Sequence, residues 1–252
     1  MKPKIEVRSI FKTFKTRQHD IRALEDINAC IYDQEIFCIM GPSGCGKSTL
    51  LFIIASLEKQ DAGEVLVDGH PVSSPGADRA VVFQADAVFP WMTVRENISY
   101  GLKVANKPKG EIQKTVNRFI QIVHLDEFQE AWPKELSGGM RKRVDLARAY
   151  ANDPDVLLMD EPFGALDLLT KEQLQMDLEE LWLQNPKTIL FVTHDVEEAL
   201  FLGDRVVVMT ARPGKISNIY EVPFDRPRTP DLKTAPEFIE LRKEISANFK
   251  IS

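Results

Sequence analysis

Short apolar runs alternate along the chain with longer stretches in which apolar residues recur every three or four positions. Four runs are apolar almost throughout, as in strands buried on both faces of a parallel sheet. They cover 36–40, 156–159, 188–192 and 206–209. Stretches with helical spacing, such as 48–58 and 168–184, lie between such runs. This alternation predicts an α/β fold with a mainly parallel sheet.

The first third of the chain follows another pattern. Ile5, Val7 and Ser9 alternate with polar residues, and 27–31 repeats this spacing. A further run ends in Asp68-Gly69, a dipeptide typical of tight hairpin turns. We therefore expect an N-terminal antiparallel β subdomain.

Two later regions differ from the α/β core. Strand signals vanish between 85 and 152, where helical spacing over 93–103 and 111–123 predicts an inserted helical lobe. The tail, 223–252, begins with a proline-rich turn region and ends in a short amphipathic helix. The apolar face of that helix carries Phe238, Leu241, Ile245 and Phe249, and we expect it to dock on its own domain. Residues 1–252 are thus expected to form a single domain.

One glycine-rich segment has the spacing of a phosphate-binding loop. It fits G-x-x-x-x-G-K-[ST] and reads Gly41-Pro42-Ser43-Gly44-Cys45-Gly46-Lys47-Ser48. Its backbone N–H groups are expected to surround nucleotide phosphates, while Lys47 reaches the β- and γ-phosphates and Ser48 ligates Mg²⁺. Because a predicted strand precedes the segment and a predicted helix follows it, a chance match has odds of about one in twenty or less.

A second segment suited to an anion is Leu136-Ser137-Gly138-Gly139-Met140, at the start of the helical stretch 140–151. A helix N-terminus carries free N–H donors and positive dipole character, which favour a negatively charged ligand. The chain therefore holds two candidate phosphate-binding segments.

Polar side chains follow three of the predicted strands. They are Asp160 and Glu161 after 156–159, Gln84 after 80–83, and His194 after 188–192. The carboxyl ends of parallel strands meet at the ligand-binding edge of such a sheet. There Asp160 suits Mg²⁺, and Glu161 can take a proton from an attacking water. The Gln84 amide suits the metal or that water, and the His194 imidazole suits a γ-phosphate.

Composition narrows the class of protein. The formal charge is −6 and apolar residues make up 44%, which is ordinary for a globular domain and argues against a nucleic-acid partner. The sequence has no apolar run near the roughly 20 residues that span a bilayer, and its start lacks a signal peptide's apolar stretch. We expect a chain that is soluble by itself and remains where it is made.

Taken in order, these segments resemble the ATP-binding subunits of ABC transporters, and the resemblance covers nearly the whole chain. Gln84 matches the Q-loop of that family, 136–140 its signature, 164–167 its D-loop and His194 its switch histidine. Phe14 stands where the family places an aromatic ring that stacks on adenine. The resemblance implies a dimer of two ATPase chains in which each ATP lies between the phosphate loop of one chain and the signature of the other.

The resemblance also implies roles and partners. It assigns catalysis to Glu161, His194 and Gln84, and Mg²⁺ to Ser48, Gln84 and Asp160. Contacts with ATP are assigned to Phe14, Gly41, Pro42, Ser43, Gly44, Cys45, Gly46, Lys47, Ser48, Thr49, Ser137, Gly138, Gly139 and Asp167. Expected partners are a second ATPase chain, as a homodimer, then transmembrane permease subunits and, indirectly, an extracytoplasmic solute-binding protein. Expected location is the cytoplasmic face of the membrane.

Several shorter segments resemble the nitrate, sulfonate and taurine importer branch of that family. Examples are Phe89-Pro90-Trp91, Val192-Thr193-His194-Asp195 and Pro227-Arg228. That branch imports small anions or organic solutes. An export ATPase shares every catalytic residue and stays open as an alternative, and a non-transport ABC ATPase is a more distant one.

Five positions depart from the sequence pattern of the family, and one of them is Met140, where the signature more generally ends in Gln. Gln34 and Ser56 stand where glycine is common, and Lys142 and Asp145 stand where Gln and a small residue are common. We expect Lys142 and Asp145, three residues apart, to form a pair on the helix surface. The segment 89–92 after Gln84 has two interpretations, the edge of an apolar groove for a membrane-subunit helix or plain packing of the lobe.

Overall fold

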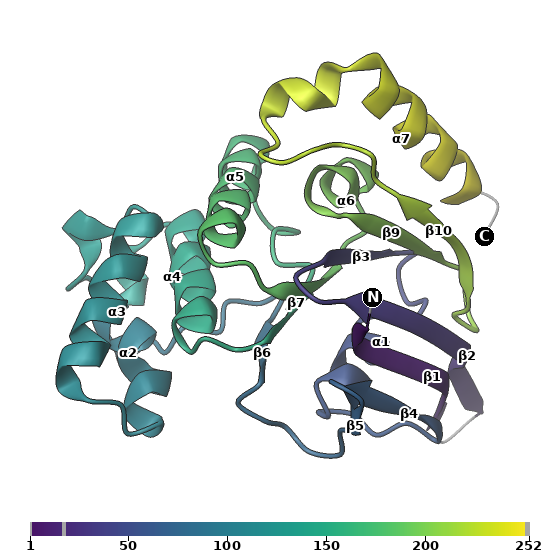
Figure 1. The fold of residues 1–252 in the computed structure, drawn as a ribbon, viewed down its shortest axis with the longest axis horizontal. Coiled ribbons are helices and arrows are strands. Elements are labelled where there is room, and N and C mark those ends of the chain that lie inside the picture. The colour runs from purple at the N-terminus through teal and green to yellow at the C-terminus, as the bar shows by residue number, and fades with distance from the viewer. Residues whose placement is uncertain (1, 17–18, 250–252) are drawn as a thin grey trace.

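Two β-sheets lie against each other on one side of the molecule, and a group of helices lies on the other side (Figure 1). The computed structural model describes residues 2–16 and 19–249, with the backbone alone for residue 249. None of the helices among these residues is long and apolar enough to cross a membrane.

The larger sheet is mainly parallel, as predicted. Its strand order is β10-β9-β3-β8-β7-β6, and all neighbours run parallel except β10 beside β9. The strands are β3 (Ile36–Met40), β6 (Arg79–Val82), β7 (Val156–Asp160), β8 (Thr188–Val192), β9 (Arg205–Met209) and β10 (Ile216–Glu221). Every residue of β3, β7 and β8 is buried, which explains why these strands read as continuous apolar runs.

The smaller sheet is antiparallel and has the order β2-β1-β4-β5, which confirms the expected N-terminal subdomain. Its strands are β1 (Pro3–Lys15), β2 (Asp20–Tyr32), β4 (Ala62–Val67) and β5 (His70–Pro71). Asp68-Gly69 joins β4 to β5 as a two-residue hairpin turn. The expected alternation stops at Ser9, which is exposed at φ 46°, because a bulge shifts the register and Ile10 takes the next core position.

Seven α-helices connect or cover the strands in the described residues. They are α1 (Lys47–Ile54), α2 (Val94–Val104), α3 (Lys109–Ile122), α4 (Gly138–Ala151), α5 (Leu168–Gln184), α6 (Val196–Leu202) and α7 (Pro236–Phe249). Helices α2, α3 and α4 form the lobe, joined by short 3₁₀ turns at Asp126–Phe128 and Pro133–Glu135. A third 3₁₀ turn, Pro230–Thr234, precedes α7.

Two departures from the family have a direct structural meaning. Helix α1 ends at Ile54 rather than near 58 because Ser56 has φ 58°, outside the right-handed helical region. Gln34, in the turn between β2 and β3, has φ 57°. Glycine adopts this left-handed conformation without steric cost, so the common glycines at both positions mark a backbone requirement that this chain meets with other residues.

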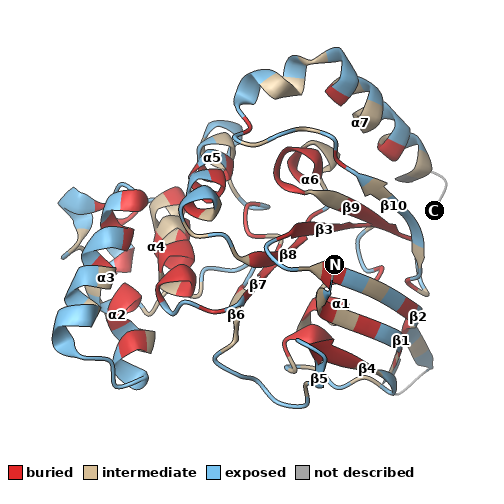
Figure 2. Ribbon diagram, in the orientation of Figure 1, coloured by how far each residue is buried: buried red, intermediate tan, exposed pale blue. Residues whose placement is uncertain are grey.

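The core has two parts, on the two faces of the parallel sheet (Figure 2). Side chains of β3 alternate between them, with Phe37 in the part that includes α1 and the smaller sheet, and Cys38 in the part that includes α4, α5 and α6. This double covering holds the strand ends rigidly, which positions the polar residues that follow them.

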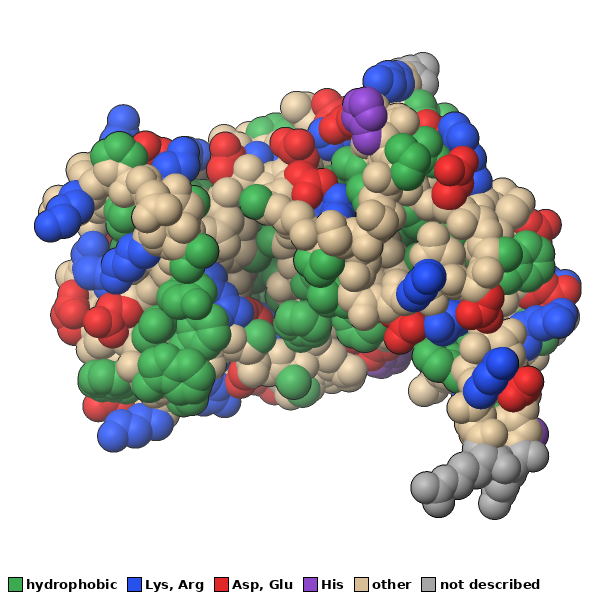
Figure 3. Space-filling model, turned by 90° about the horizontal axis from the view of Figure 1, so that it is seen from below, with side chains coloured by type: hydrophobic (Ala, Val, Ile, Leu, Met, Phe, Trp, Pro, Cys, Tyr) green, Lys and Arg blue, Asp and Glu red, His purple; other side chains and the backbone are tan. Residues whose placement is uncertain are grey.

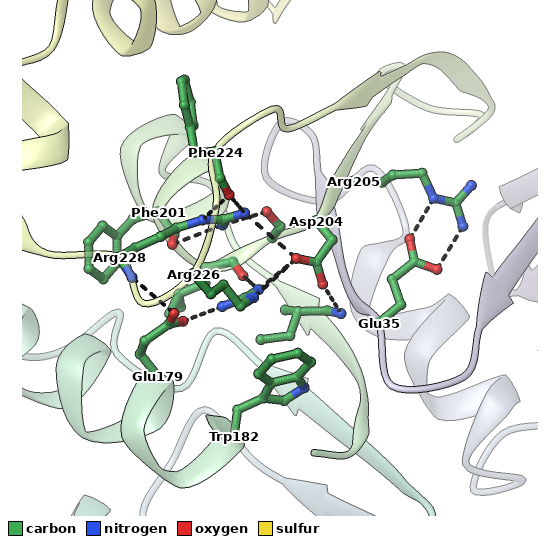
Figure 4. Close-up of polar contacts among 12 residues, drawn as sticks. Glu35, Glu179, Trp182, Phe201, Asp204, Arg205, Phe224, Arg226 and Arg228 are labelled. Atoms are coloured by element: carbon green, nitrogen blue, oxygen red, sulfur yellow. Dashed lines mark hydrogen bonds and ion pairs between the residues drawn. The ribbon is translucent and has the colours of Figure 1, made fainter. Parts of the chain in front are cut away.

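After β10, residues 222–229 cross α5 and α6, and we call this segment the C-terminal arm. Arg226 pairs with Glu179 of α5 and with Asp204 (2.9 Å), and its guanidinium lies 4.5 Å from the Trp182 ring centre (Figure 4). Arg228 is buried and donates to the carbonyl groups of Leu200, Phe201, Gly203 and Phe224. The first three of these carbonyls lie at the C-terminal end of α6, so Arg228 supplies the donors that a helix end lacks.

Helix α7 docks on its own chain through the buried side chains of Phe238 and Ile245, and Leu241 is partly buried against the same core. This agrees with the expected docking of the tail. The predicted contribution of the Phe249 side chain lies outside the described residues.

Candidate active site

A cavity of about 480 Å³ opens where the phosphate-binding loop meets the ends of the strands and the first hairpin. Nine of the residues that sequence reasoning assigned to the site line it. They are Phe14, Ser43, Gly44, Gly46, Lys47, Ser48, Thr49, Gln84 and Glu161. Residues more than 140 positions apart in the sequence thus share one cavity, because the sheet brings their strand ends together.

The phosphate-binding loop joins β3 to α1. Gly44 (φ 75°) and Gly46 (φ 106°) adopt conformations that favour glycine, and Gly46 is the N-cap of α1. Lys47 is 5% exposed and donates from Nζ to the carbonyls of Gly41 (2.8 Å) and Pro42 (3.3 Å). The loop therefore folds over its lysine and directs the N-terminus of α1 toward the cavity, where an anion is favoured.

Cys45 does not present its thiol to the cavity. Its side chain is buried in the core beside β3, and burial raises the pKa of the thiol. Of the contacts expected for Cys45, only those of its backbone are therefore compatible with this position. Gly41 and Pro42 likewise do not line the cavity among the described residues, and their carbonyls hold Lys47.

The end of β7 carries two adjacent carboxylates. Ser48 Oγ donates to Asp160 Oδ1 at 2.8 Å. Asp160 is 6% exposed, and burial, followed by the negative charge of Glu161, raises its pKa. A buried carboxylate with a second carboxylate next to it, and a serine hydroxyl beside it, is an arrangement that a divalent cation stabilises. The residues therefore fit Mg²⁺ held by Ser48 and Asp160.

Glu161 is held in a conformation that is unusual for a residue with a side chain, with φ 42°. Its Oε2 lies 3.1 Å from His194 Nδ1, and its Oε1 lies 3.8 Å from Lys47 Nζ. His194 itself is exposed and follows β8, so it reaches the site through Glu161 rather than by lining the cavity. Backbone strain of this kind concentrates at functional sites because the surrounding structure must enforce it.

Three residues that line the cavity were missed by sequence reasoning. They are Ile21 and Ala23 of β2, and Arg212, whose Nε donates to the Gly44 carbonyl at 2.9 Å. Arg212 follows the end of β9 by three residues, so its position at a strand end was the available signal. Ile21 lies opposite Phe14 in the β1–β2 ladder, and the pair forms an apolar wall suited to a base ring.

The second candidate phosphate-binding segment, 136–140, lies away from the cavity. Ser137 is the N-cap of α4 and accepts a hydrogen bond from Met140 N, while Gly139 is buried where an added Cβ would contact Thr170. Asp167 is the N-cap of α5, and the hydrogen bond from Thr170 lowers the pKa of its carboxyl. Among the described residues that line the cavity, Ser137, Gly138, Gly139 and Asp167 are all absent.

The strand, glycine loop and helix, together with Asp160 and Glu161 at the next strand but one, define a P-loop nucleoside triphosphatase. Among such proteins, residues 24–164 match the family model for ABC transporters, which covers more than half of the chain. The chain belongs to this family as an ATP-binding subunit with ATPase activity, which confirms the predicted family.

Relatives extend the match over nearly the full length. An uncharacterized ABC transporter ATP-binding protein of Methanocaldococcus jannaschii is 48% identical over 97% of this chain and 91% of its own. A taurine import ATP-binding protein of Roseobacter denitrificans is 47% identical over 89% of this chain and 85% of its own. An aliphatic sulfonates import ATP-binding protein of Bacillus cereus is 42% identical over 98% of this chain and 96% of its own. These names agree with the predicted branch.

A solved dimeric structure of a bacterial ABC transporter cassette is also similar. It is 32% identical, covers 88% of this chain and 100% of its own, and superposes with a TM-score of 0.77. A structure of the same cassette in a post-hydrolysis state bound to ADP and Pi gives a TM-score of 0.73 at 30% identity. These matches confirm the fold class.

Proposed function

We propose that two copies of this chain bind two ATP molecules between them, and that the resulting cycle drives import through a membrane permease. The observation that carries this proposal is the separation of the two phosphate-binding segments. The cavity beside Lys47 is lined without Ser137, Gly138 or Gly139, although these residues form a helix N-terminus suited to phosphate. A second copy, arranged head to tail, would supply that helix end to the open side of the cavity.

Within each site, the chain's own groups divide the chemistry. Glu161 accepts a proton from a water molecule as the water oxygen bonds to the γ-phosphorus, and the bond to the β–γ bridging oxygen breaks to release ADP. His194 holds Glu161 Oε2, while Lys47 neutralises charge on the β- and γ-phosphates. Ser48 and Asp160, with Gln84 from the facing loop, would hold Mg²⁺, which would neutralise further phosphate charge.

The transported solute is proposed to be a small organic anion, such as taurine or another sulfonate, or an anion such as nitrate. The relatives named for taurine and aliphatic sulfonate import support this choice. The chain would act at the cytoplasmic face of the membrane, and an external solute-binding protein would deliver the solute to the permease without touching this chain.

Exposed aromatic side chains on the lobe support a surface for the permease. Trp91 is 65% exposed, and its ring stacks on Phe89, which also contacts the ring of Tyr100. The interpretation of 89–92 as plain core packing therefore fails for Trp91. Figure 3 shows hydrophobic side chains gathered on the lobe side of the molecule. A short apolar helix of a membrane subunit would fit such a surface.

Mixing two inactive variants tests the shared site. Lys47→Ala disables the phosphate loop of one copy, and Ser137→Arg blocks the signature of another. If sites form between copies, a mixed dimer contains one intact site, so mixing should restore turnover that neither variant shows alone. If each chain holds a complete site, mixing restores nothing, and the proposal is wrong.

Co-purification tests the transport role. The tagged chain is purified from gently solubilised membranes of its source cells, and its partners are identified by mass spectrometry. A multi-span permease supports the proposal, and an accompanying solute-binding protein supports import over export. Recovery with soluble partners alone would contradict the transport role and leave the ATPase assignment unchanged.

A further inference from the structure

Helix α4 carries charged side chains inside the protein, where sequence reasoning placed them on the surface. Lys142 and Asp145 are each 2% exposed, with Lys142 Nζ 3.8 Å from Asp145 Oδ2. Arg148 donates to Asp145 Oδ1 at 2.6 Å. The expected surface pair is therefore wrong, because both residues face inward. Charged groups at this depth require hydrogen-bond or ion-pair partners. The partners of Lys142, Asp145 and Arg148, which we call the α4 charge cluster, indicate its role.

The cations of this cluster hold the backbone of the segment that contains Gln84. Lys142 Nζ donates to the carbonyls of Phe83 (2.9 Å) and Gln84 (3.4 Å), and Arg148 donates to the carbonyl of Ala87 (2.7 Å). Strand β6 ends at Val82, so these carbonyls lie beyond its ladder of hydrogen bonds. Side chains of α4 thus provide donors that the strand no longer supplies.

A third residue of α4, Arg141, contacts the segment 83–87 from the solvent-exposed side. Arg141 Nε donates to Asp86 Oδ2 at 2.7 Å, and Arg141 also donates to the carbonyl of Leu136, the first residue of the signature. The segment 83–87 is therefore held at several points by one helix, although its own side chains, including Gln84, are mostly exposed.

From this geometry we infer that Lys142 is a positioning residue for Gln84. It fixes the backbone from which the Gln84 amide reaches the cavity. Asp145 supplies the negative charge that faces the buried ammonium group, and Arg148 pairs with the other oxygen of Asp145. The inference rests on the proposed role of Gln84 in the site. A misplacement of about 1 Å at a catalytic group can cost up to about a hundredfold in rate, so loosening this backbone should reduce turnover.

A purely structural role, in which Lys142 only neutralises Asp145, makes a different prediction. In that case Lys142→Met would damage the protein by leaving Asp145 with less compensating charge. Lys142→Met/Asp145→Asn, which removes that charge but keeps an acceptor oxygen for Arg148 and the Ala87 backbone, would then restore both stability and turnover. If Lys142 positions Gln84, the double variant recovers stability but remains slow. Lys142→Gln keeps N–H donors for the carbonyls and should retain most of the turnover.

The experiment measures kcat and KM for ATP and the amide hydrogen exchange of residues 83–87 in the full chain. We expect Lys142→Met and the double variant to lower kcat about tenfold with KM nearly unchanged, and to speed exchange in that segment. Arg143→Met is the matched control, because Arg143 lies on the same helix and pairs with the buried Asp177 at 2.8 Å. It should leave exchange in 83–87 unchanged.

Two results would overturn the inference: unchanged exchange in 83–87 after Lys142→Met, or wild-type kcat in the double variant. Gln84→Ala, measured in parallel, separates this failure from that of the proposed site. If Gln84→Ala slows turnover while the double variant does not, the positioning role alone is wrong. If Gln84→Ala has no effect either, the role assigned to Gln84 is wrong and the inference falls with it.

Discussion

Charged side chains gather at the candidate active site and at the C-terminal arm. In the arm they are paired with groups of opposite charge or polarity, whereas at the site two groups of like charge are neighbours. In the arm, Arg226 faces two carboxylates, and Arg228 donates to four backbone carbonyls. At the site, the carboxylates of Asp160 and Glu161 are neighbours of like charge, and Glu161 has a positive φ. Charge in the arm stabilises the fold, whereas charge in the site costs stability that a bound ligand would recover.

The same substitution made in both regions should give opposite results. Glu161→Gln removes the proposed base, so turnover should fall about a thousandfold while thermal stability stays equal or rises. Glu179→Gln removes the carboxylate that pairs with Arg226, so stability should fall by about 2 kcal/mol with turnover per folded molecule unchanged. Phosphate release and thermal unfolding, measured on both variants, check the contrast.

Full residual turnover in Glu161→Gln would remove Glu161 as the base. A loss of stability in Glu161→Gln equal to that in Glu179→Gln would show that the site carboxylates are structural, and the comparison between the two regions would fail.

Within the arm, Arg228→Met should produce the largest loss of stability. It leaves the carbonyls at the end of α6 buried without their donors, which should cost about 3 kcal/mol. Urea unfolding measures this loss. Arg228→Lys is the control, because lysine keeps the positive charge but lacks the planar guanidinium. Its stability should lie between that of the wild type and that of Arg228→Met. Slower turnover with an unchanged unfolding midpoint would instead connect the arm to the chemistry.

Within the site, Asp160→Asn should stabilise the chain. Burial, then the charge of Glu161, raises the pKa of Asp160, so the folded state holds this proton more tightly than the unfolded state. The stability cost of ionising Asp160 therefore grows as pH rises from about 4, the ordinary aspartate value, through the raised pKa, and is full above that pKa. The variant should gain about 1 kcal/mol at pH 7 and nothing below pH 4.

Thermal unfolding between pH 4 and pH 8, with and without MgATP, checks this prediction. The variant should also lose the stabilisation that MgATP gives to the wild type. An equal gain at all pH values would mean that titration of Asp160 is not the cause, and retained stabilisation by MgATP would contradict its role toward the cation.

Much of the site follows from local sequence, because its parts are short segments in a fixed context. The loop at Lys47 lies between a strand and a helix, and Asp160 ends an apolar run, so the sheet edge was predictable. Of the residues missed at the cavity, Ile21 and Ala23 lie within β2, where apolar side chains are ordinary strand residues, and Arg212 lies in the loop after β9, where only its place near a strand end was a signal. No periodicity could reveal the positive φ of Glu161, since surrounding contacts impose it.

The error at Lys142 and Asp145 has a different cause. A charged pair three residues apart on a helix is usually exposed, and sequence reasoning followed that rule. The rule fails here because α4 packs against the segment 83–87, whose carbonyls need donors. This requirement arises from the ends of two distant elements, so it becomes visible only in three dimensions.

The smallest predicted effect concerns Arg212, which shares features of both regions. It lines the cavity like a site residue, yet it donates to the Gly44 carbonyl like an arm residue. Because this hydrogen bond is exposed to solvent, Arg212→Ala should change stability little and weaken ATP binding about threefold, through a looser phosphate loop and one fewer positive charge. Lys215→Ala is the matched control. Lys215 carries an exposed positive charge on the same β9–β10 loop as Arg212, but it does not line the cavity. Titration with a fluorescent ATP analogue at two salt concentrations separates the causes, because a pure charge effect weakens with added salt. An equal loss in both variants would assign the effect to net charge, and a fall in stability without a change in affinity would place Arg212 with the structural charges of the arm.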